Sequence, residues 1–181
     1  MTPFTLADAR AATDAWGANC GPGALAAILG LSLDAVHPHL KKFDQKHYTN
    51  PAMMRGALQS LKVDHDWKVG RFGLFPRYGL ARVQWEGPWT VPGVPVAAAY
   101  RHTHWVGSAR LDRSVSDPHD VKIFDINAIC VGGWIDLPQW SAQLVPWLLK
   151  QCEPKASGGW WLTHAVEIRK RAKGVMYITP T

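Results

Sequence analysis

The apolar pattern of the chain changes at Val63, and this change restricts the fold more than any other feature. Before Val63, apolar residues recur at the spacing of a helix. After it, short apolar stretches alternate with glycine and proline, which is typical of strands separated by turns. Helices followed by strands predict an α+β fold, in which a helical part (about 1–62) packs on an antiparallel sheet (about 63–181). A chain of 181 residues predicts a single domain.

The start and end signals of helices are clear in the helical part. Pro22 belongs in the first turn of a helix that begins at Cys20, and Gly30 ends that helix. Asn50 is the N-cap of a later helix that starts with Pro51. The expected helices are about 6–13, 20–29, 32–40 and 50–61, with a short one over 141–150 that Pro146 limits.

The strands of the second part are read from apolar stretches bounded by turn residues. The expected strands are 72–75, 80–85, 94–100, 105–111, 121–126, 166–169 and 174–178, and residues 114–120 form a polar connection. No repeat, linker or low-complexity segment interrupts the pattern.

Cys20 lies at the expected start of a helix, in the segment NCGPG followed by ALAAILG. A thiol is nucleophilic only as a thiolate, and a helix N-terminus favours the thiolate through its backbone dipole and its free N–H groups. The small residues on either side leave the sulfur accessible to a substrate. The alternative interpretation is a buried cysteine that packs in the first turn of a core helix.

A histidine and an acidic residue follow on two consecutive expected strands. His104 stands at the start of one strand, and Asp125 lies in the next. A cysteine on an early helix, a histidine on a later strand and an acid on the next strand follow the order of a Cys–His–acid triad, whose acid orients the histidine ring. On adjacent antiparallel strands the histidine and the acid can be neighbours. His102 is the alternative base, and Asn127 is the alternative orienting residue.

The segment NCGPGALAAIL resembles the nucleophile helix of papain-like cysteine peptidases. It is most similar to the branch that processes double-glycine leader peptides of bacteriocins. The histidine of that family, followed by an aromatic residue and a valine, is matched at His104 rather than His102, and its apolar strand ending in an acid is matched by VKIFDIN. The resemblance covers roughly residues 14–130. It implies Cys20 as nucleophile, His104 as base and Asp125 as orienting residue.

The sequence departs from that family at the oxyanion position. The family has a glutamine six residues before the cysteine, and Asp14 stands there in this chain. A carboxylate at that position repels a developing oxyanion unless it is protonated. Asn19 and the backbone N–H of Cys20 are the other candidate oxyanion donors.

Ten tryptophans are an unusual number for a chain of this length. Trp105 follows the candidate base, and Trp160 and Trp161 follow two glycines, so all three are candidates for lining a substrate groove. For Trp160 and Trp161, packing in the core is the favoured interpretation, because buried aromatic residues dominate core packing.

The histidines and acidic residues do not predict a metal site or another cofactor. His37 and His39 form one close pair, and Asp117, His119 and Asp120 form a loop cluster. None has the spacing of a HExxH motif, and the three cysteines form no metal-binding pair. His37 and His39 are interpreted as surface or capping residues.

Charge and composition restrict the partners. The net charge is +6, but the basic residues form only one short run, over 169–173, so a nucleic-acid partner is not expected. No apolar run reaches the roughly 18 residues of a membrane span. The N-terminus has no signal-peptide pattern, and the odd cysteine count favours a reduced, cytoplasmic setting, with association with a virion as the alternative.

These features predict a cysteine-dependent hydrolase that cleaves an amide bond of a peptide or protein through a thioester, without a cofactor. An acyltransferase or a deamidase with the same triad is one alternative, because the site does not determine the acceptor. A binding or structural protein that has lost the chemistry, such as a component of a phage particle, is the other. The sequence gives no indication of the oligomeric state.

Overall fold

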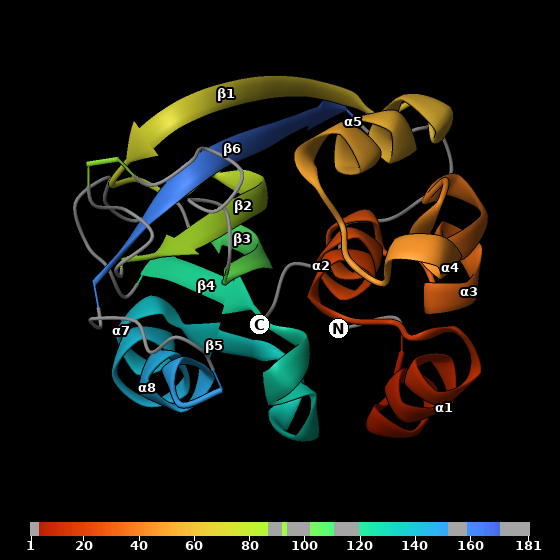
Figure 1. Cartoon of the computed structure of the whole chain (residues 1–181), viewed down its shortest axis with the longest axis horizontal. Coiled ribbons are helices and arrows are strands. Elements are labelled where there is room, and N and C mark those ends of the chain that lie inside the picture. Colours follow the sequence, from red (N-terminus) through yellow and green to blue (C-terminus); the bar gives the residue numbers. More distant parts are fainter. Residues whose placement is uncertain (1–3, 87–91, 94–101, 111–119, 152–158, 171–181) are drawn as a thin grey trace.

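The computed structural model describes residues 4–86, 92–93, 102–110, 120–151 and 159–170 (Figure 1). Its helices are α1 (Leu6–Trp16), α2 (Cys20–Leu29), α3 (Leu33–Val36), η1 (His37–His39), α4 (Phe43–Lys46), α5 (Pro51–Ser60), η4 (Ile126–Val131), α7 (Leu137–Gln139), η5 (Trp140–Leu144) and α8 (Val145–Leu149). Its strands are β1 (Asp64–Phe72), β2 (Tyr78–Trp85), β3 (Thr103–Arg110), β4 (Val121–Phe124), β5 (Trp134–Asp136) and β6 (Trp160–Lys170).

The six strands form one antiparallel sheet in the order β1-β6-β2-β3-β4-β5. Helices α1 to α5 cover one face of this sheet, and α7 and α8 cover the other (Figure 1). The α+β architecture with an antiparallel sheet is therefore confirmed. In the described part of the chain the helices that precede the sheet end at Ser60, and β1 begins at Asp64.

Alternation along the strands produces two hydrophobic cores, one on each face of the sheet. Leu80 and Val166 point toward the helices α1 to α5 and pack with Leu25 and Ile28 of α2. The neighbouring residues, such as Ala81 and Val83, point the other way and pack with the aromatic side chains near α7 and α8. Because α2 lies inside the first core, its N-terminus is held against the sheet.

Helix α2 is defined at both ends by its own sequence. The Asn19 side chain accepts a hydrogen bond from the N–H of Gly21, and Gly30 ends the helix in the left-handed conformation (φ 65°), which glycine adopts without strain. All residues from Gly21 to Leu29 are buried. The predicted helices over 20–29 and 50–61 are both confirmed, the latter as α5 with Asn50 as its N-cap.

Gly21 allows the start of α2 to lie against the loop before α5. A Cβ atom at Gly21 would overlap with the side chain of Thr49, so Gly21→Ala is expected to lower the free energy of unfolding by about 1–3 kcal/mol. Urea denaturation measures this loss. Gly56→Ala in α5 is the matched control, because a Cβ there meets no atom within 4 Å and alanine is the better helix former. A Gly21→Ala variant as stable as the wild type would contradict this packing.

Before the sheet, the expected helices differ from the structure at three places. Helix α1 continues to Trp16, beyond the predicted end near Thr13. The predicted helix over 32–40 ends as α-helix at Val36 and continues as a 3₁₀ turn that contains Pro38, because proline lacks an N–H for the helical ladder. The short helix α4 was not predicted.

A helical segment over 137–149 replaces the predicted helix over 141–150, and its middle turn is a π-helix, η5. Pro146 lies in the first turn of α8, directly after that π turn. Because the proline nitrogen cannot donate the hydrogen bond of an α-helix, the register of the backbone bonds changes at this point.

The largest error concerns the first strand, which was predicted over 72–75 and lies at 64–72. Its sequence DHDWKVGRF is rich in polar residues because β1 is the edge strand of the sheet. Strand β4 ends at Phe124, two residues before the predicted end, and β6 begins at Trp160, six residues before the predicted strand at 166–169. The predicted strands 94–100 and 174–178 lie outside the described residues, as does the connection 114–120 except for Asp120.

No single helix in the described ranges is both long and apolar enough to cross a membrane. Helix α2 and residues 33–39 are long and apolar enough only when counted together, and they meet at an angle of 100°. Helix α2 is buried in the first core.

Candidate functional site

Cys20 is the first residue of α2, and its side chain is half-buried at the seam between the helices and the sheet. The N-cap residue Asn19 is held at both ends of its amide group. Its Oδ1 accepts from the N–H of Gly21 at 3.3 Å, and its Nδ2 donates to the backbone carbonyl of His47 at 2.9 Å. These bonds fix the direction in which the chain enters α2, and therefore the position of the Cys20 sulfur.

His104 lies on β3, where its ring is held by Asp125 and lies near Cys20. Its Nε2 donates to Asp125 Oδ2 at 2.7 Å, and the Cys20 thiol lies close enough to the ring for each of these two residues to shift the pKa of the other. Because Nε2 is engaged by the carboxylate, Nδ1 is the ring nitrogen left for the thiol. The structure thus brings together the three residues of the predicted Cys–His–acid order.

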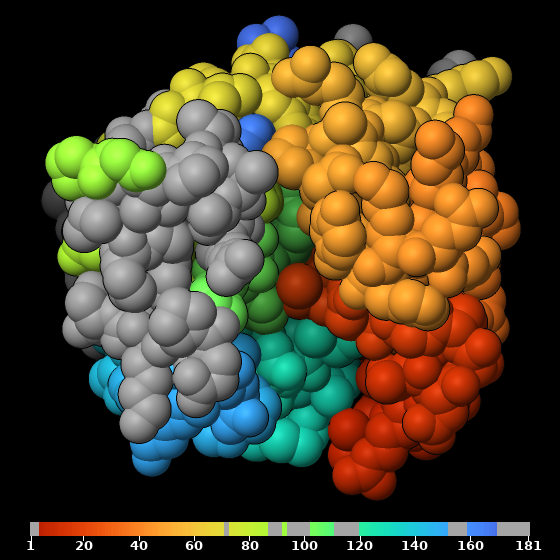
Figure 2. All heavy atoms as spheres, in the orientation of Figure 1, coloured from red at the N-terminus to blue at the C-terminus, as the bar shows by residue number. Residues whose placement is uncertain are grey.

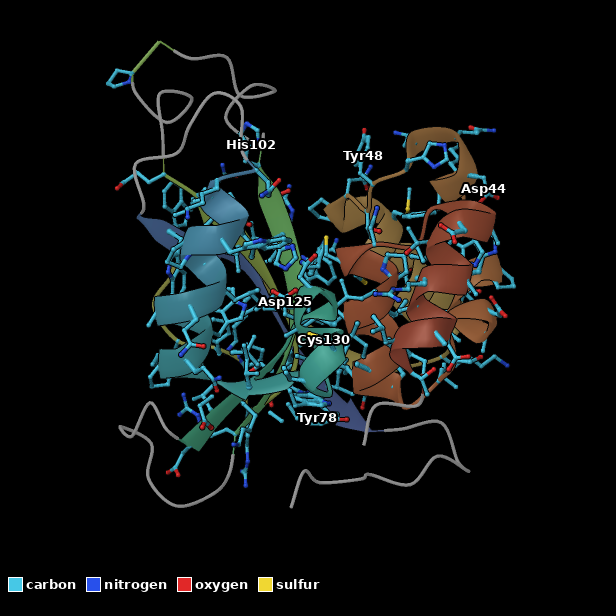
Figure 3. All side chains as sticks on the ribbon, turned by 90° about the horizontal axis from the view of Figure 1, so that it is seen from below. Asp44, Tyr48, Tyr78, His102, Asp125 and Cys130 are labelled. Carbon is cyan, nitrogen blue, oxygen red and sulfur yellow. The ribbon has the colours of Figure 1, made fainter. Side chains whose placement is uncertain are left out.

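Asp125 is fully buried and lies between the end of β4 and η4. Its Oδ1 accepts from the backbone N–H and the side-chain Nδ2 of Asn127, at 3.0 and 2.9 Å. Asn127, the alternative orienting residue, therefore contacts the carboxylate, and Asp125 is the residue that contacts the histidine ring. Figure 3 shows Asp125 in the interior, at the junction between the sheet and the helical part.

Trp140 also holds the carboxylate of Asp125, a role that the sequence analysis did not predict. Its indole Nε1 donates to Asp125 Oδ2 at 2.9 Å, and the whole side chain is buried in the second core. The only signal in the sequence is general: a buried tryptophan needs an acceptor for its N–H. Nothing in the sequence distinguishes Trp140 from the other tryptophans in this respect.

The charges of the three residues stabilise one another. Burial of the thiol raises the pKa of Cys20, but the positive charge and hydrogen bond of His104, together with the backbone N–H of Trp105, outweigh it and leave the pKa lowered. Burial lowers the pKa of His104, yet the charges of Asp125 and Cys20 hold it well above its usual range. For Asp125, burial raises the pKa, but the charge and hydrogen bond of His104 and the hydrogen bonds from the other donors outweigh burial and leave the pKa lowered.

These pKa directions define the reactive form of the site. A lowered thiol pKa and a raised imidazole pKa favour a thiolate–imidazolium pair, with the Asp125 carboxylate behind the imidazolium. The pair exists between the two pKa values, because the thiolate is protonated below the first and the imidazolium loses its proton above the second. A thiolate next to a proton donor can attack a carbonyl carbon and protonate the leaving group.

Two cavities meet at Cys20. The larger, with a volume of about 760 Å³, lies between the loop before α5 and the strands β2, β3 and β6. The smaller, about 320 Å³, lies between α1 and η4. Asn19 and Cys20 line both, so together the cavities form a groove that crosses the sulfur. Figure 2 shows the hollow between the orange helical segments and the green strands.

The larger cavity has a helical wall and a sheet floor. Tyr48 and Thr49 stand on the helical side, and His102 and Trp105 stand on the sheet side. Figure 3 shows Tyr48 and His102 on opposite sides of the opening. His102, the alternative base, therefore lines the cavity, whereas His104 is the residue bonded to Asp125.

The candidate oxyanion residues lie on the smaller cavity. Asp14 is exposed and lines this cavity together with Asn19. The amide of Asn19 already bonds Gly21 and His47. The N–H of Cys20 belongs to the first turn of α2, whose N–H groups have no acceptor within the helix. The backbone N–H of Cys20 is therefore the best placed of the candidate donors.

Of the three tryptophans that are candidates for the groove, two lie elsewhere. Trp105 lines the larger cavity, and its indole donates to the Thr49 carbonyl at 2.8 Å. Trp160 instead packs against Phe75 and Trp140 in the second core. Trp161 pairs with a residue of β2 and lines neither cavity. The reason is that residues 160–170 form an interior strand of the sheet, between β1 and β2, and not a loop.

The surface histidines hold helices in place. His37 bonds Asp44 at 2.6 Å and stacks on Trp16, and His39 bonds Ser60 at 2.8 Å. Within the described residues, no group of three or more histidine, cysteine or acidic side chains could hold a metal ion. Asp117 and His119 lie outside the described part of the chain.

Comparison of the chain with protein-family models, with curated proteins and with solved structures gave no match. The function is therefore argued from the geometry of the site.

Proposed function

We propose that the chain is a papain-like cysteine hydrolase that cleaves an amide bond of a peptide or protein, with Cys20 as nucleophile, His104 as acid and base, and Asp125 as orienting residue. One observation carries the proposal: the His104 ring is held by the buried Asp125 carboxylate at 2.7 Å and faces a thiol of lowered pKa. The groove of two cavities across Cys20 has the extended form that a peptide needs.

The reaction follows from these positions. The Cys20 thiolate attacks the carbonyl carbon, and the oxyanion forms beside the N–H groups at the start of α2. The His104 imidazolium donates its proton to the leaving nitrogen, so that the C–N bond breaks and a thioester remains. His104, now neutral, removes a proton from water as the water attacks the thioester. The C–S bond then breaks and restores the thiolate–imidazolium pair.

Asp125 contributes through His104 and does not contact the substrate. Its carboxylate bonds the ring nitrogen that faces away from the thiol, which selects the tautomer and fixes the ring plane. Asn127 and Trp140 donate to the same carboxylate and keep it in place.

The test uses the purified protein and its Cys20→Ala variant. Both are incubated with a peptide library and with peptidoglycan, and new amino termini are detected by mass spectrometry. We expect cleavage by the wild type alone, because the nucleophile is lost in the variant. If the two proteins give the same products on every substrate, the hydrolase proposal fails.

A non-catalytic binding protein is the second candidate, and Asp14 is the observation that favours it. The carboxylate of Asp14 lies on the smaller cavity beside Cys20, where it opposes negative charge on the substrate.

We expect Asp14→Gln to raise the rate of amide cleavage by roughly tenfold, because a repelling charge is replaced by a hydrogen-bond donor. The measurement is kcat/KM on any peptide that the wild type cleaves. A lower rate in Asp14→Gln would show that the carboxylate does not oppose the oxyanion.

A further inference from the structure

The floor of the larger cavity contains a buried arginine. Arg82 on β2 is only 4% exposed, and in the sheet it lies between Trp105 on β3 and His164 on β6. All three side chains line the cavity that begins at Cys20. Trp105 directly follows His104, so Arg82 lies on the strand next to the one that carries His104.

Two hydroxyl groups hold the guanidinium of Arg82. Its two terminal nitrogens donate to Thr103 Oγ1 at 2.9 Å and to Thr163 Oγ1 at 3.3 Å. Thr103 precedes His104 on β3, and Thr163 lies at the irregularity where β6 shifts its register against β2. The position of this charge is therefore fixed by the two strands on either side.

Arg82 is the one arginine or lysine among the described residues that line the cavity. No described residue that lines it is acidic. Burial, followed by the charges of Arg82 and of the nearby Arg55, lowers the pKa of His164 to about 4, so His164 is neutral at physiological pH. The guanidinium charges of Arg82 and Arg55, which disfavour a protonated His164, would favour a bound anion.

We propose that the larger cavity binds a carboxylate of the substrate, with Arg82 as the residue that selects it. This inference rests on the proposed hydrolase function and names its substrate class: peptides with a carboxylate close to the amide that Cys20 attacks. The planar guanidinium matches a carboxylate geometrically, and the burial of Arg82 strengthens the interaction relative to bulk water. The carboxylate is either an acidic side chain or a free chain terminus.

Alkylating agents that differ only in one carboxylate test the inference without any knowledge of the substrate. N-iodoacetyl-glycine is compared with N-iodoacetyl-glycinamide, and the α-amide of N-iodoacetyl-glutamic acid with the α-amide of N-iodoacetyl-glutamine. The first pair represents a terminal carboxylate, and the second represents an acidic side chain. Rates at Cys20 and at the exposed Cys130 are measured in the same sample by peptide mapping.

In the wild type, we expect the carboxylate-bearing reagent of at least one pair to alkylate Cys20 about tenfold faster than the matching amide reagent. We expect no such preference at Cys130. The preference should fall as salt is added, because salt screens the attraction. The pair with the larger preference identifies the source of the carboxylate. Equal rates for acid and amide at Cys20 in both pairs would overturn the inference.

Variants locate the preference within the groove. Arg82→Gln should reduce the ratio to about one, and Arg82→Lys should retain part of it, because the charge remains without the planar fork. Arg55→Gln changes an exposed residue and should reduce the ratio only about twofold, so it remains informative if Arg82→Gln does not fold. Arg10→Gln removes an equal charge on the smaller cavity and should leave the ratio unchanged. A ratio lost in Arg10→Gln and kept in Arg82→Gln and Arg55→Gln would contradict the assignment to the larger cavity.

The two proposals fail in different ways. If Cys20 reacts no faster than Cys130 with either member of each pair, the hydrolase proposal fails. If Cys20 reacts fast but equally with acid and amide, only the carboxylate inference fails.

Discussion

Replacement of His104 by alanine is expected to slow the alkylation of Cys20 by iodoacetamide at about pH 6.5 by roughly tenfold. The positive charge of His104 and its hydrogen bond are the interactions that lower the thiol pKa against the opposing effect of burial. Without them the thiolate fraction falls, and the higher intrinsic nucleophilicity of a more basic thiolate compensates only in part. Amide hydrolysis should fall further, by about 10³-fold or more, because the proton donor to the leaving group is also lost.

The matched control is His37→Ala. It removes a histidine–carboxylate pair of similar length, 2.6 Å to Asp44, from the surface of the helical part. We expect the alkylation rate of Cys20 to remain at the wild-type value in this variant. A His104→Ala protein in which Cys20 reacts as fast as in the wild type would show that the histidine does not activate the thiol.

Replacement of Asp125 by asparagine is expected to lower both stability and the upper pH limit of activity. The carboxylate is fully buried and accepts from His104, Trp140 and Asn127. An amide in its place points its NH₂ group at one of these donors, which should reduce the free energy of unfolding by about 2–4 kcal/mol. The charge of Asp125 is the main interaction that raises the pKa of His104, so the alkaline limb of the pH–rate profile should move to lower pH.

The pH dependence of stability distinguishes the loss of the buried Asp125 charge from a general loss of packing in the Asp125→Asn variant. The pKa of Asp125 is lowered in the folded protein, so its stabilising contribution is present above the unfolded value of about 4 and is lost as the pH falls through the folded value. The difference in unfolding free energy between wild type and Asp125→Asn should therefore shrink on acidification. Urea denaturation at neutral and acidic pH measures it.

Asp136→Asn is the control for Asp125→Asn. It removes a carboxylate from a partly exposed pair with Lys122 at 2.6 Å, and such pairs contribute about 0–1 kcal/mol. If Asp125→Asn is no less stable than Asp136→Asn, and its pH–rate profile is that of the wild type, the assigned role of Asp125 is wrong.

The sequence predicted the elements that local signals define. The caps Asn19 and Asn50 and the terminal Gly30 mark helix ends because their chemistry acts within a few residues. Strand β1 was misplaced because an edge strand need not be apolar on both faces, and its polar residues concealed it. Apolar stretches reveal buried strands and give no signal for a polar edge strand such as β1.

The candidate site was predictable in part. Cys20, His104 and Asp125 follow a recognisable order along the chain, and the structure brings their side chains together. Trp140 was not predictable, because its contact with Asp125 depends on how α7 and η5 pack on the far face of the sheet.

Arg82 shows a different limit of sequence analysis. Arg82 and Gln84 alternate with Ala81, Val83 and Trp85, a pattern that is usual for a strand with one face in water. The structure instead buries Arg82 and its neighbour on the same face, Gln84, because both lie between β3 and β6 at the centre of the sheet. Alternation shows which residues share a face and does not show what covers that face.

The activation of Cys20 by His104 is tested most directly by the pH dependence of alkylation at Cys20 and Cys130 in one wild-type sample. The proposed site predicts that Cys20 reacts with an inflection below the value of about 8.5 for an ordinary thiol and remains reactive at about pH 6, where thiols of ordinary pKa are almost fully protonated. A Cys20 profile that inflects near 8.5, with no reaction at about pH 6 beyond that of Cys130, would contradict the thiolate–imidazolium pair and with it the hydrolase proposal.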